Sequence, residues 1–275
     1  MATIVVLEHR HQAKLGIHYM AHEFALRWQE LGHRVIFHRG LEAPPPGDVA
    51  ILHHDLTVVP EAYLEVARRY PRVVNAATAD IRKSRYSDCL LARGDPWAGR
   101  VLVKTEANHG GHVDHALRRA ALAAGEAPDI DEGVVMDSYY LCDCLARVPD
   151  AIWTTPGVIV EKFVPEEDER GAYMRFWTFF GSEERSFRYR APANVALIRF
   201  SDCIDREAIA VPEEIRAIRE RLGFDFGKFD YVKHDGRYFL LDANRTPGAP
   251  DAFTADPSVK ASLERIAGAI REFLC

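Results

Sequence analysis

The segment that most constrains the fold lies near the C-terminal end of the chain. Two runs of alternating apolar and polar residues, 226–233 and 237–242, are separated by Asp235-Gly236, a strong signal for a tight turn. This pattern predicts a β-hairpin. Lys228 and Asp230 lie two residues apart on the first strand, so their side chains project from one face of it.

Asp242 and Asn244 have the same spacing at the end of the second strand. A two-residue turn pairs Asp230 with Leu241 and puts the two acids on opposite faces, whereas a three-residue loop over 235–237 pairs Asp230 with Asp242. Two facing carboxylates repel each other unless a cation lies between them, and two carboxylates with an amide oxygen suit Mg²⁺. A magnesium site therefore requires the longer loop or a β-bulge. Otherwise the segment is only a polar turn that closes a hairpin.

Composition limits the class of protein. With 275 residues, 48% of them apolar, the chain can bury the core of one large or two compact domains. The net charge of −6 comes with dispersed Lys and Arg, so nucleic acid is not an expected partner. No apolar run approaches the roughly 20 residues that span a bilayer, and the first residues lack a signal-peptide pattern. Five irregularly spaced cysteines fit a reducing compartment, so we expect a cytoplasmic protein without a membrane partner.

The first 75 residues alternate strand and helix patterns. Apolar residues at helical spacing predict helices near 17–31 and 60–70. The strand candidates around them are 3–7, 34–38, 48–54 and 72–75. This alternation predicts a small α/β domain with a parallel sheet, and a domain boundary near 76–100.

The rest of the chain reads as α+β, because several strand candidates follow one another in hairpin order. Besides the hairpin above, the candidates are 100–104, 157–163, 172–181 and 185–190. An apolar stripe from Val259 to Phe273 predicts a closing helix, with Asp256 as its N-cap and Pro257 in its first turn.

Residues 101–111 place Lys104 at the end of an apolar strand candidate, ahead of a loop with Gly110 and Gly111. A lysine that leaves a buried strand needs a partner for its charge, and glycines let backbone N–H groups approach phosphate oxygens closely. The spacing differs from that of the P-loop. The segment therefore favours another kind of phosphate site.

Residues 158–165 read as a buried strand that runs into a hinge, followed by the acidic stretch 166–169. Backbone exposed at a hinge can recognise an adenine edge, and a nearby carboxylate can accept hydrogen bonds from ribose. An edge strand with a solvated acidic turn explains the same pattern.

Arg175 interrupts an apolar strand candidate and needs a partner such as phosphate. Arg245, after the hairpin, either binds a carboxylate or lies in a solvated turn.

Taken in this order, the segments resemble the ATP-grasp superfamily of carboxylate-amine ligases, such as D-alanine–D-alanine ligase, glutathione synthetase and the ribosomal-protein glutamate ligases. The resemblance covers residues 76–275 and implies a two-lobed ATP-grasp domain. Its central lobe would span about 100–165 and its C-terminal lobe about 166–275. Residues 1–75 would form the small parallel-sheet domain that precedes the grasp.

The resemblance also implies a nucleotide site. Lys104 corresponds to the strand-end lysine that contacts the α and β phosphates of ATP, and Lys83 to an earlier nucleotide lysine. Gly110 and Gly111 fall in the family's lid loop. The adenine hinge and the ribose carboxylate correspond to Glu161, Lys162, Val164 and Asp168, with Glu166 as the alternative to Asp168.

The catalytic groups follow from the same resemblance. Arg175 and Lys228 correspond to basic groups that meet the transferred phosphate and the tetrahedral intermediate, and either Arg188 or Arg190 to a group that contacts the γ-phosphate. The implied Mg²⁺ ligands are Asp230, Asp242 and Asn244. The chain departs from the family at Asp242, where glutamate is usual, and in the lid, where Asn108-His109 replaces glycine and serine.

These matches imply a ligase that uses ATP and Mg²⁺ to join a carboxylate to an amine through an acyl phosphate, releasing ADP and phosphate. Its substrates would be small molecules or peptides, and a homodimer is compatible with the sequence.

Two other functions stay open. The departures are compatible with a non-catalytic ATP-binding module. His109, His112 and His115 recur at intervals of three, which suggests a transition-metal hydrolase, although no acidic residue accompanies them in a known ligand pattern.

Overall fold

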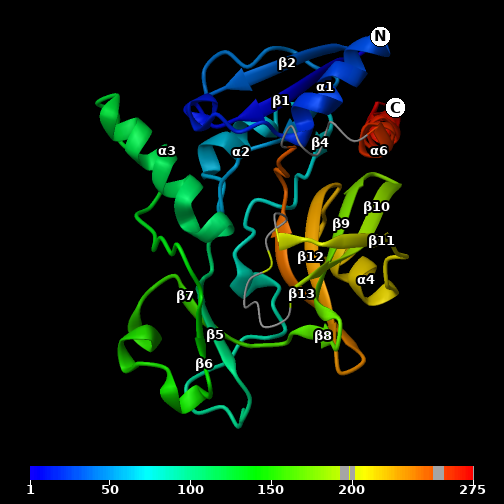
Figure 1. Ribbon diagram of the computed structural model, residues 1–275. Helices are drawn as coiled ribbons and strands as arrows, with labels where there is room; N and C mark the ends of the chain where they lie inside the picture. The colour runs from blue at the N-terminus through cyan, green and yellow to red at the C-terminus, as the bar shows by residue number, and fades with distance from the viewer. Residues whose placement is uncertain (193–197, 199–201, 250–256, 275) are drawn as a thin grey trace.

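A computed structural model gives the fold and describes residues 1–192, 198, 202–249 and 257–274. The described strands form three sheets (Figure 1). The first sheet is parallel throughout, in the order β2-β1-β3-β4. Its elements are β1 (Thr3–Glu8), α1 (Met20–Glu30), β2 (Arg34–Arg39), β3 (Val49–Leu52), α2 (Glu61–Ala67) and β4 (Val73–Val74). The predicted parallel α/β arrangement at the N-terminus is confirmed.

The second sheet has three antiparallel strands in the order β6-β5-β7. Its elements are β5 (Val101–Thr105), α3 (His112–Ala123), β6 (Tyr140–Cys142) and β7 (Val158–Lys162). Figure 1 shows α3 following this sheet and lying beside the N-terminal part of the chain. In the first turn of α3, the carboxylate of Asp114 accepts hydrogen bonds from the backbone N–H (3.0 Å) and the hydroxyl (2.5 Å) of Thr57, in the loop after β3.

The third and largest sheet is antiparallel, in the order β11-β10-β9-β12-β13, with β8 paired to β9. Its strands are β8 (Glu166–Asp168), β9 (Gly171–Phe180), β10 (Glu183–Ala191), β11 (Asp205–Ala208), β12 (Phe226–His234) and β13 (Arg237–Asn244). Helix α4 (Glu213–Leu222) covers one face, where Ile215 packs with Trp177 and Phe229. The opposite face is left open toward the second sheet.

The predicted hairpin is confirmed, and its register answers the question that the sequence left open. The turn has two residues, with His234 opposite Arg237 and positive φ at Asp235 (47°) and Gly236 (80°). The register then shifts by one residue at Leu241, because Tyr231 pairs with Leu240 while Asp230 pairs with Asp242. This β-bulge places the two acids directly opposite each other.

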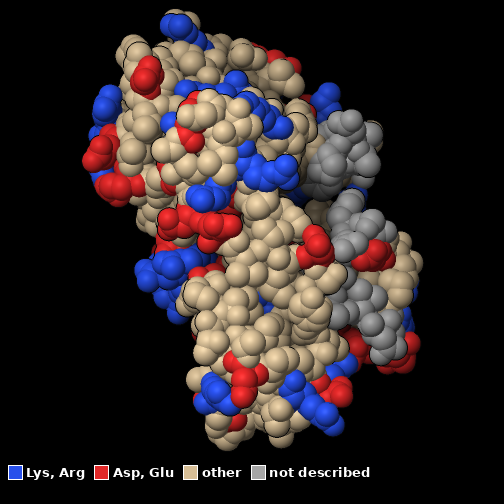
Figure 2. Space-filling model, turned by 90° about the vertical axis from the view of Figure 1, so that its left-hand side faces the viewer, with Lys and Arg blue, Asp and Glu red and all other residues tan. Residues whose placement is uncertain are grey.

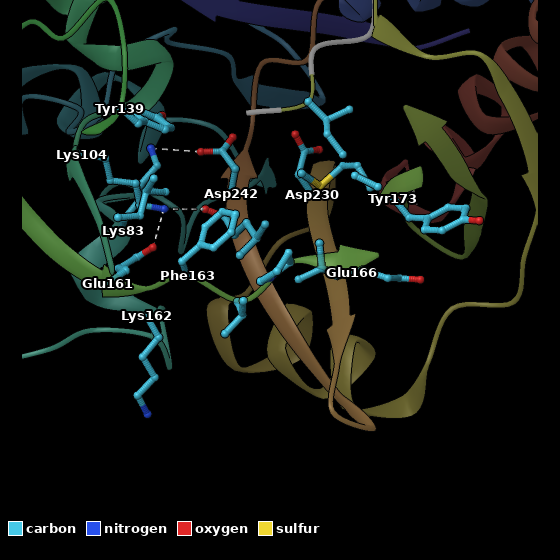
Figure 3. Close-up of a pocket in the computed structure, with 18 of the residues that line it drawn as sticks. Lys83, Lys104, Tyr139, Glu161, Lys162, Phe163, Glu166, Tyr173, Asp230 and Asp242 are labelled. Carbon is cyan, nitrogen blue, oxygen red and sulfur yellow. Dashed lines mark hydrogen bonds and ion pairs between the residues drawn. The ribbon is translucent and has the colours of Figure 1, made fainter. Parts of the chain in front are cut away.

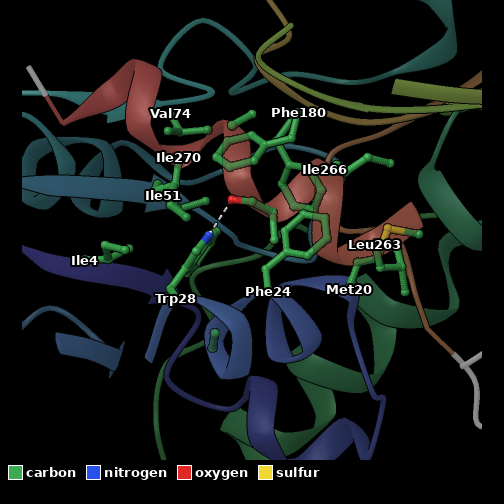
Figure 4. Packing of buried hydrophobic residues seen from close by; sticks show 14 of the residues in the cluster. Ile4, Met20, Phe24, Trp28, Ile51, Val74, Phe180, Leu263, Ile266 and Ile270 are labelled. Carbon is green, nitrogen blue, oxygen red and sulfur yellow. Dashed lines mark hydrogen bonds between the residues drawn. The ribbon is translucent and has the colours of Figure 1, made fainter. Parts of the chain in front are cut away.

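The largest hydrophobic cluster joins both ends of the chain (Figure 4). Helix α6 (Pro257–Ala267) packs against α1, and the indole N–H of the fully buried Trp28 donates to the carbonyl of Ala267 at 2.8 Å. Phe180 and Ile266 lie in the same cluster. The predicted N-cap Asp256 lies outside the described residues. The division of the chain at residue 75 remains a prediction.

Short 3₁₀ helices connect these elements. They are Gln12–Leu15, Lys83–Arg85, Asn108–Gly111, Leu145–Arg147, Asp150–Thr154 and Gly268–Phe273. Basic and acidic side chains are interspersed over the face of the molecule in Figure 2, as the dispersed sequence charge predicts. None of the helices in the described ranges is both long and apolar enough to cross a bilayer.

Candidate active site

A cavity of about 300 Å³ lies between the second sheet and the open face of the third (Figure 3). Its walls come from β5, β7, the hinge after β7, and strands β9, β12 and β13. Nine of the residues expected to form the site line it: Lys83, Lys104, Glu161, Lys162, Val164, Lys228, Asp230, Asp242 and Asn244. Residues from four separate segments of the sequence therefore meet in one place.

The hairpin supplies the acids. Asp230 lies opposite Asp242, and Lys228 lies opposite Asn244, so all four side chains share one face. The Lys228 ammonium donates to Oδ2 of Asp230 at 3.1 Å and lies 2.9 Å from its Oδ1. Each carboxylate has its own lysine, because Lys83 Nζ lies 3.1 Å from Oδ1 of Asp242.

The pKa values of the two carboxyls shift in opposite directions. Burial raises the pKa of Asp230; Lys228 opposes this shift, while the neighbouring Asp242 adds to it. Burial would also raise the pKa of Asp242, but its basic neighbours, with Lys83 the largest contributor, outweigh burial and lower it. Asp242 is therefore the first of the pair to ionise, and its charge disfavours ionisation of Asp230.

This donor set fits Mg²⁺. Oδ1 of Asp230 is buried and lies 2.9 Å from the Lys228 ammonium, in an ion pair whose geometry is not that of a hydrogen bond. A divalent cation between the two carboxylates would remove their repulsion and engage that oxygen. The amide oxygen of Asn244 accepts a hydrogen bond from the backbone N–H of Thr246 at 2.8 Å, which fixes the side chain beside the acids. Two carboxylates and one amide leave coordination positions for water or phosphate oxygens.

Two lysines enter the cavity from the opposite side. Lys104 Nζ lies 2.6 Å from Oε2 of Glu161, and both side chains are at most 4% exposed. Lys83 Nζ also donates to the carbonyl of Ala107 at 2.8 Å. Figure 3 shows both lysines facing the hairpin acids. Buried lysines across from partly exposed carboxylates suit a ligand that carries both a polyanion and a metal ion.

The hinge after β7 forms the apolar end of the cavity. The backbone N–H groups of Lys162 and Phe163 donate to the carbonyls of Cys89 (2.7 Å) and Arg100 (3.0 Å), which fixes the chain direction. Val164 follows and lines the cavity. The apolar side chains that face it there are Leu102, Met174, Val232 and Leu241. A flat, mostly apolar group such as a nucleobase fits between the hinge and these apolar side chains.

No protein-family model and no curated protein matches this sequence. Solved structures do. D-alanine–D-alanine ligase from Bacillus anthracis, complexed with ATP, aligns over 100% of this chain and 97% of that one, with a TM-score of 0.54 and 14% identity. A RimK domain protein from Sphaerobacter thermophilus aligns over 99% of both chains, with a TM-score of 0.52 and 14% identity.

A third match is the ATP-grasp ligase PsnB, in complex with a precursor variant, Mg and ADP. It covers 98% of both chains, with a TM-score of 0.54 and 12% identity. All three alignments cover at least 98% of this chain, so the likeness includes the N-terminal sheet as well as the two sheets around the cavity. The chain has the ATP-grasp fold. The expected fold class is thereby confirmed.

Within this ATP-grasp fold, the lid loop differs from expectation. Gly110 and Gly111 do not line the cavity. Both have positive φ, and a Cβ on Gly110 would lie 2.6 Å from the carbonyl oxygen of Met136. These glycines therefore let the segment after α3 pack against the loop. His109 lines the cavity instead, with φ at 47° and its Nε2 3.3 Å from Nδ2 of Asn244.

The structure does not bring the three expected arginines to the cavity. Arg175 lies opposite both Arg188 and Tyr231, whose ring is in the core beneath α4. All three side chains therefore lie on the sheet face that points away from Asp230. Arg175 and Arg188 bond Glu166 instead, at 2.7 and 2.9 Å.

Arg190 has the same parity along β10 and pairs with Asp205. Asp168, the expected ribose carboxylate, is exposed, accepts a hydrogen bond from the hydroxyl of Tyr173 at 2.9 Å, and does not line the cavity. Its alternative, Glu166, does line it. Sequence reasoning missed Arg185, which lies opposite Thr178 on the face of the acids. Along β10, Arg185 has the opposite parity to Arg188 and Arg190, which predicts that its side chain lies on the other face of the strand. Only the strand register shows that this face is the one that carries the acids.

The histidines that suggested a transition-metal hydrolase do not gather. His109 faces Asn244, whereas His112 lies 3.4 Å from Asp137 on the outside of α3. Across the described ranges, no three His, Cys, Asp or Glu side chains are placed to hold one metal ion. The geometry therefore gives the hydrolase no support.

Proposed function

We propose that this protein is an ATP- and Mg²⁺-dependent ligase that joins a carboxylate to an amine through an acyl phosphate, with release of ADP and phosphate. One observation carries the proposal: the bulge at Leu241 sets Asp230 opposite Asp242 beneath the cations Lys83 and Lys104. Partly exposed carboxylates facing buried lysines suit a metal-bound triphosphate.

In this proposal the two ends of the cavity bind different parts of ATP. The backbone of Val164 meets the adenine edge, and the apolar walls enclose the base. Lys104 exchanges its partner Glu161 for phosphate oxygens, and Lys83 does the same with Asp242. Mg²⁺, held by the acids and by Asn244, would neutralise the charge that develops on the phosphate oxygens.

The chemistry then needs few protein groups. A carboxylate oxygen of the substrate attacks the γ-phosphorus, the bond from that phosphorus to the β–γ bridging oxygen breaks, and ADP leaves. The amine nitrogen attacks the acyl carbon, phosphate leaves, and the nitrogen loses a proton. Lys228 lies beside the acids as a positioned cation; burial opposes its charge, but the neighbouring Asp230 raises its pKa. It would stabilise the oxyanion of the second step.

The test is ADP release in the presence of candidate carboxylates and hydroxylamine. Hydroxylamine replaces the unknown amine and traps an acyl phosphate as a hydroxamate. The panel includes small acids and peptides, because PsnB is a matched ligase whose structure holds a peptide precursor. We expect Mg²⁺-dependent ADP and hydroxamate in equal amounts. ATP binding without ADP release on any acid would instead indicate a non-catalytic module, and absence of ATP binding would refute the proposal.

A further inference from the structure

A second cavity, of about 250 Å³, adjoins the proposed nucleotide site. Lys228 and Asp230 line both cavities, so the second one opens at the point where the metal and the γ-phosphate would lie. The other side chains that line it are Met20, Phe176, Thr178, Arg185, Phe187, Tyr189 and Ile198. No role in the function proposed above uses these residues.

The floor of this cavity carries two cations in one cross-strand row. Thr178 of β9 lies directly opposite Arg185 of β10 on one side and Lys228 of β12 on the other. Neighbouring strands are about 4.8 Å apart, so a carboxylate above Thr178 lies within reach of both cations. Arg185 is only 9% exposed, and the planar guanidinium suits a carboxylate better than an ammonium does.

The next row is aromatic. Phe187 lies opposite Phe176, and the ring centroids of Phe176 and Tyr189 are 4.9 Å apart. The Lys228 ammonium lies 4.6 Å from the centroid of Phe176, which joins the cationic row to the aromatic one. The walls beside the two cations are therefore apolar and favour a ring or a branched apolar group.

The start of α1 and the segment after β13 form a further wall of the cavity. The backbone N–H of Met20 donates to the carbonyl of Pro247 at 2.9 Å, and Tyr19 forms a β-bridge with Gly248. Met20 and Gly248 both line the cavity. A mostly apolar space of this size holds one ring with a short acid chain.

We propose that this cavity binds the carboxylate substrate and selects an acid with an aromatic or bulky apolar body. Arg185, Thr178 and Lys228 hold the carboxylate beside the γ-phosphate, while Phe176, Phe187 and Tyr189 contact the body. Arg185 is thereby a substrate-binding residue, and the aromatic row determines specificity. This inference rests on the ligase function proposed above.

The first experiment compares acids on the unmodified full-length protein, with hydroxylamine as the trap. Its nitrogen attacks the acyl carbon of the acyl phosphate, releasing phosphate and a proton and leaving a hydroxamate. We expect kcat/KM for 3-phenylpropanoate to exceed the values for propanoate and succinate at least tenfold. Equal or inverted values for the small and dicarboxylic acids would overturn the inference while leaving the ligase function intact. No hydroxamate from any acid would overturn both.

The second experiment uses variants and calorimetry. Arg185→Ala should raise the KM for 3-phenylpropanoate at least tenfold and abolish the heat of its binding to the Mg²⁺·ADP complex, without changing the Kd for ATP. Phe187→Leu should lower the preference for the aromatic acid over propanoate several-fold. The change keeps an apolar side chain at this half-buried position, so the fold should be retained. Arg237→Ala, an exposed arginine on β13, is the matched control. Acid binding that is unchanged in Arg185→Ala would contradict the inference.

Discussion

Each buried lysine of the site has one carboxylate partner, which a ligand can replace. Lys104 with Glu161 and Lys83 with Asp242 are pairs in which at least one member is almost fully buried. Removing one partner of a buried pair costs about 3–5 kcal/mol, because the other charge is left without compensation. A triphosphate and a metal ion can replace the partner of each charged group, so exchange of partners avoids that cost.

The ionisation of Glu166 makes the stability of the fold depend on pH. Burial would raise the pKa of Glu166, but hydrogen bonds from Arg175 and from the backbone N–H of Lys233, together with the charges of Arg175 and Arg188, outweigh burial and hold the pKa below its ordinary value of 4.5. A carboxyl with a lowered folded-state pKa stabilises the fold fully above that value and loses this contribution as the pH falls through the folded pKa. Its stabilising effect should therefore be complete at neutral pH.

We predict that Glu166→Gln lowers the free energy of unfolding by about 2 kcal/mol at pH 7. The difference from the unmodified protein should shrink as the pH falls below 4.5, because the glutamate then gains a proton. Urea denaturation at a series of pH values measures both. The exposed neighbour Glu167→Gln is the control and should change stability little. A gap that stays constant into acid would contradict the assigned ion pair.

At the scale of elements, the hairpin shows how far sequence reasoning reaches. Alternating residues and Asp235-Gly236 predict both strands and the tight turn. The bulge at Leu241 has no local signal, because it follows from how the hairpin and its neighbours pack. The metal site therefore follows from the sequence only as one of two alternatives.

The arginines of β10 illustrate the same limit. Their faces depend on the two-residue turn after β9, where Phe180 lies opposite Glu183. A one-residue change in that register exchanges the faces, and with them Arg185 for Arg188. Helix α4 is a different case, since Ile215, Ile218 and Leu222 recur at helical spacing, yet our strand-based interpretation of this region does not predict it.

The turn itself gives a prediction. Gly236 has φ at 80° with no atom within 4 Å of its missing Cβ, so only backbone strain opposes a side chain there. Gly236→Ala should lower the free energy of unfolding by about 1 kcal/mol. Gly133→Ala is the matched control, because Gly133 also has open space but lacks a positive φ, and it should be neutral or slightly stabilising. Equal effects of the two changes in urea denaturation would contradict the turn geometry.

In the whole molecule, the N-terminal sheet is tied to the site. Arg245, immediately after the last expected metal ligand, is fully buried and donates to the carbonyls of His54, Leu56 and Thr78. Burial lowers the pKa of Arg245 to about 10. Neither sequence interpretation of this arginine was right, since it neither lies in a solvated turn nor is free to bind a carboxylate. Such long-range burial leaves no pattern in a single sequence.

The shared core predicts joint unfolding. Trp28 is fully buried between the first sheet and α6, so Trp28→Ala should cost about 3–5 kcal/mol and lower the stability of the entire chain. Trp153→Ala, at a half-buried position, should cost less, about 1–2 kcal/mol. Denaturation followed by far-UV and near-UV circular dichroism should give coincident curves. A separate early transition in Trp28→Ala would show that the N-terminal sheet unfolds alone.

The hairpin acids are proposed to hold Mg²⁺ under a triphosphate. Calorimetric titration of ATP, with and without Mg²⁺, into the unmodified protein and Asp242→Asn tests this role of the acids. We expect binding that Mg²⁺ strengthens in the unmodified protein and an affinity at least tenfold weaker in Asp242→Asn when Mg²⁺ is present, about 1.4 kcal/mol or more. Absence of binding heat in the unmodified protein, or the same Mg²⁺ dependence in both proteins, would contradict it.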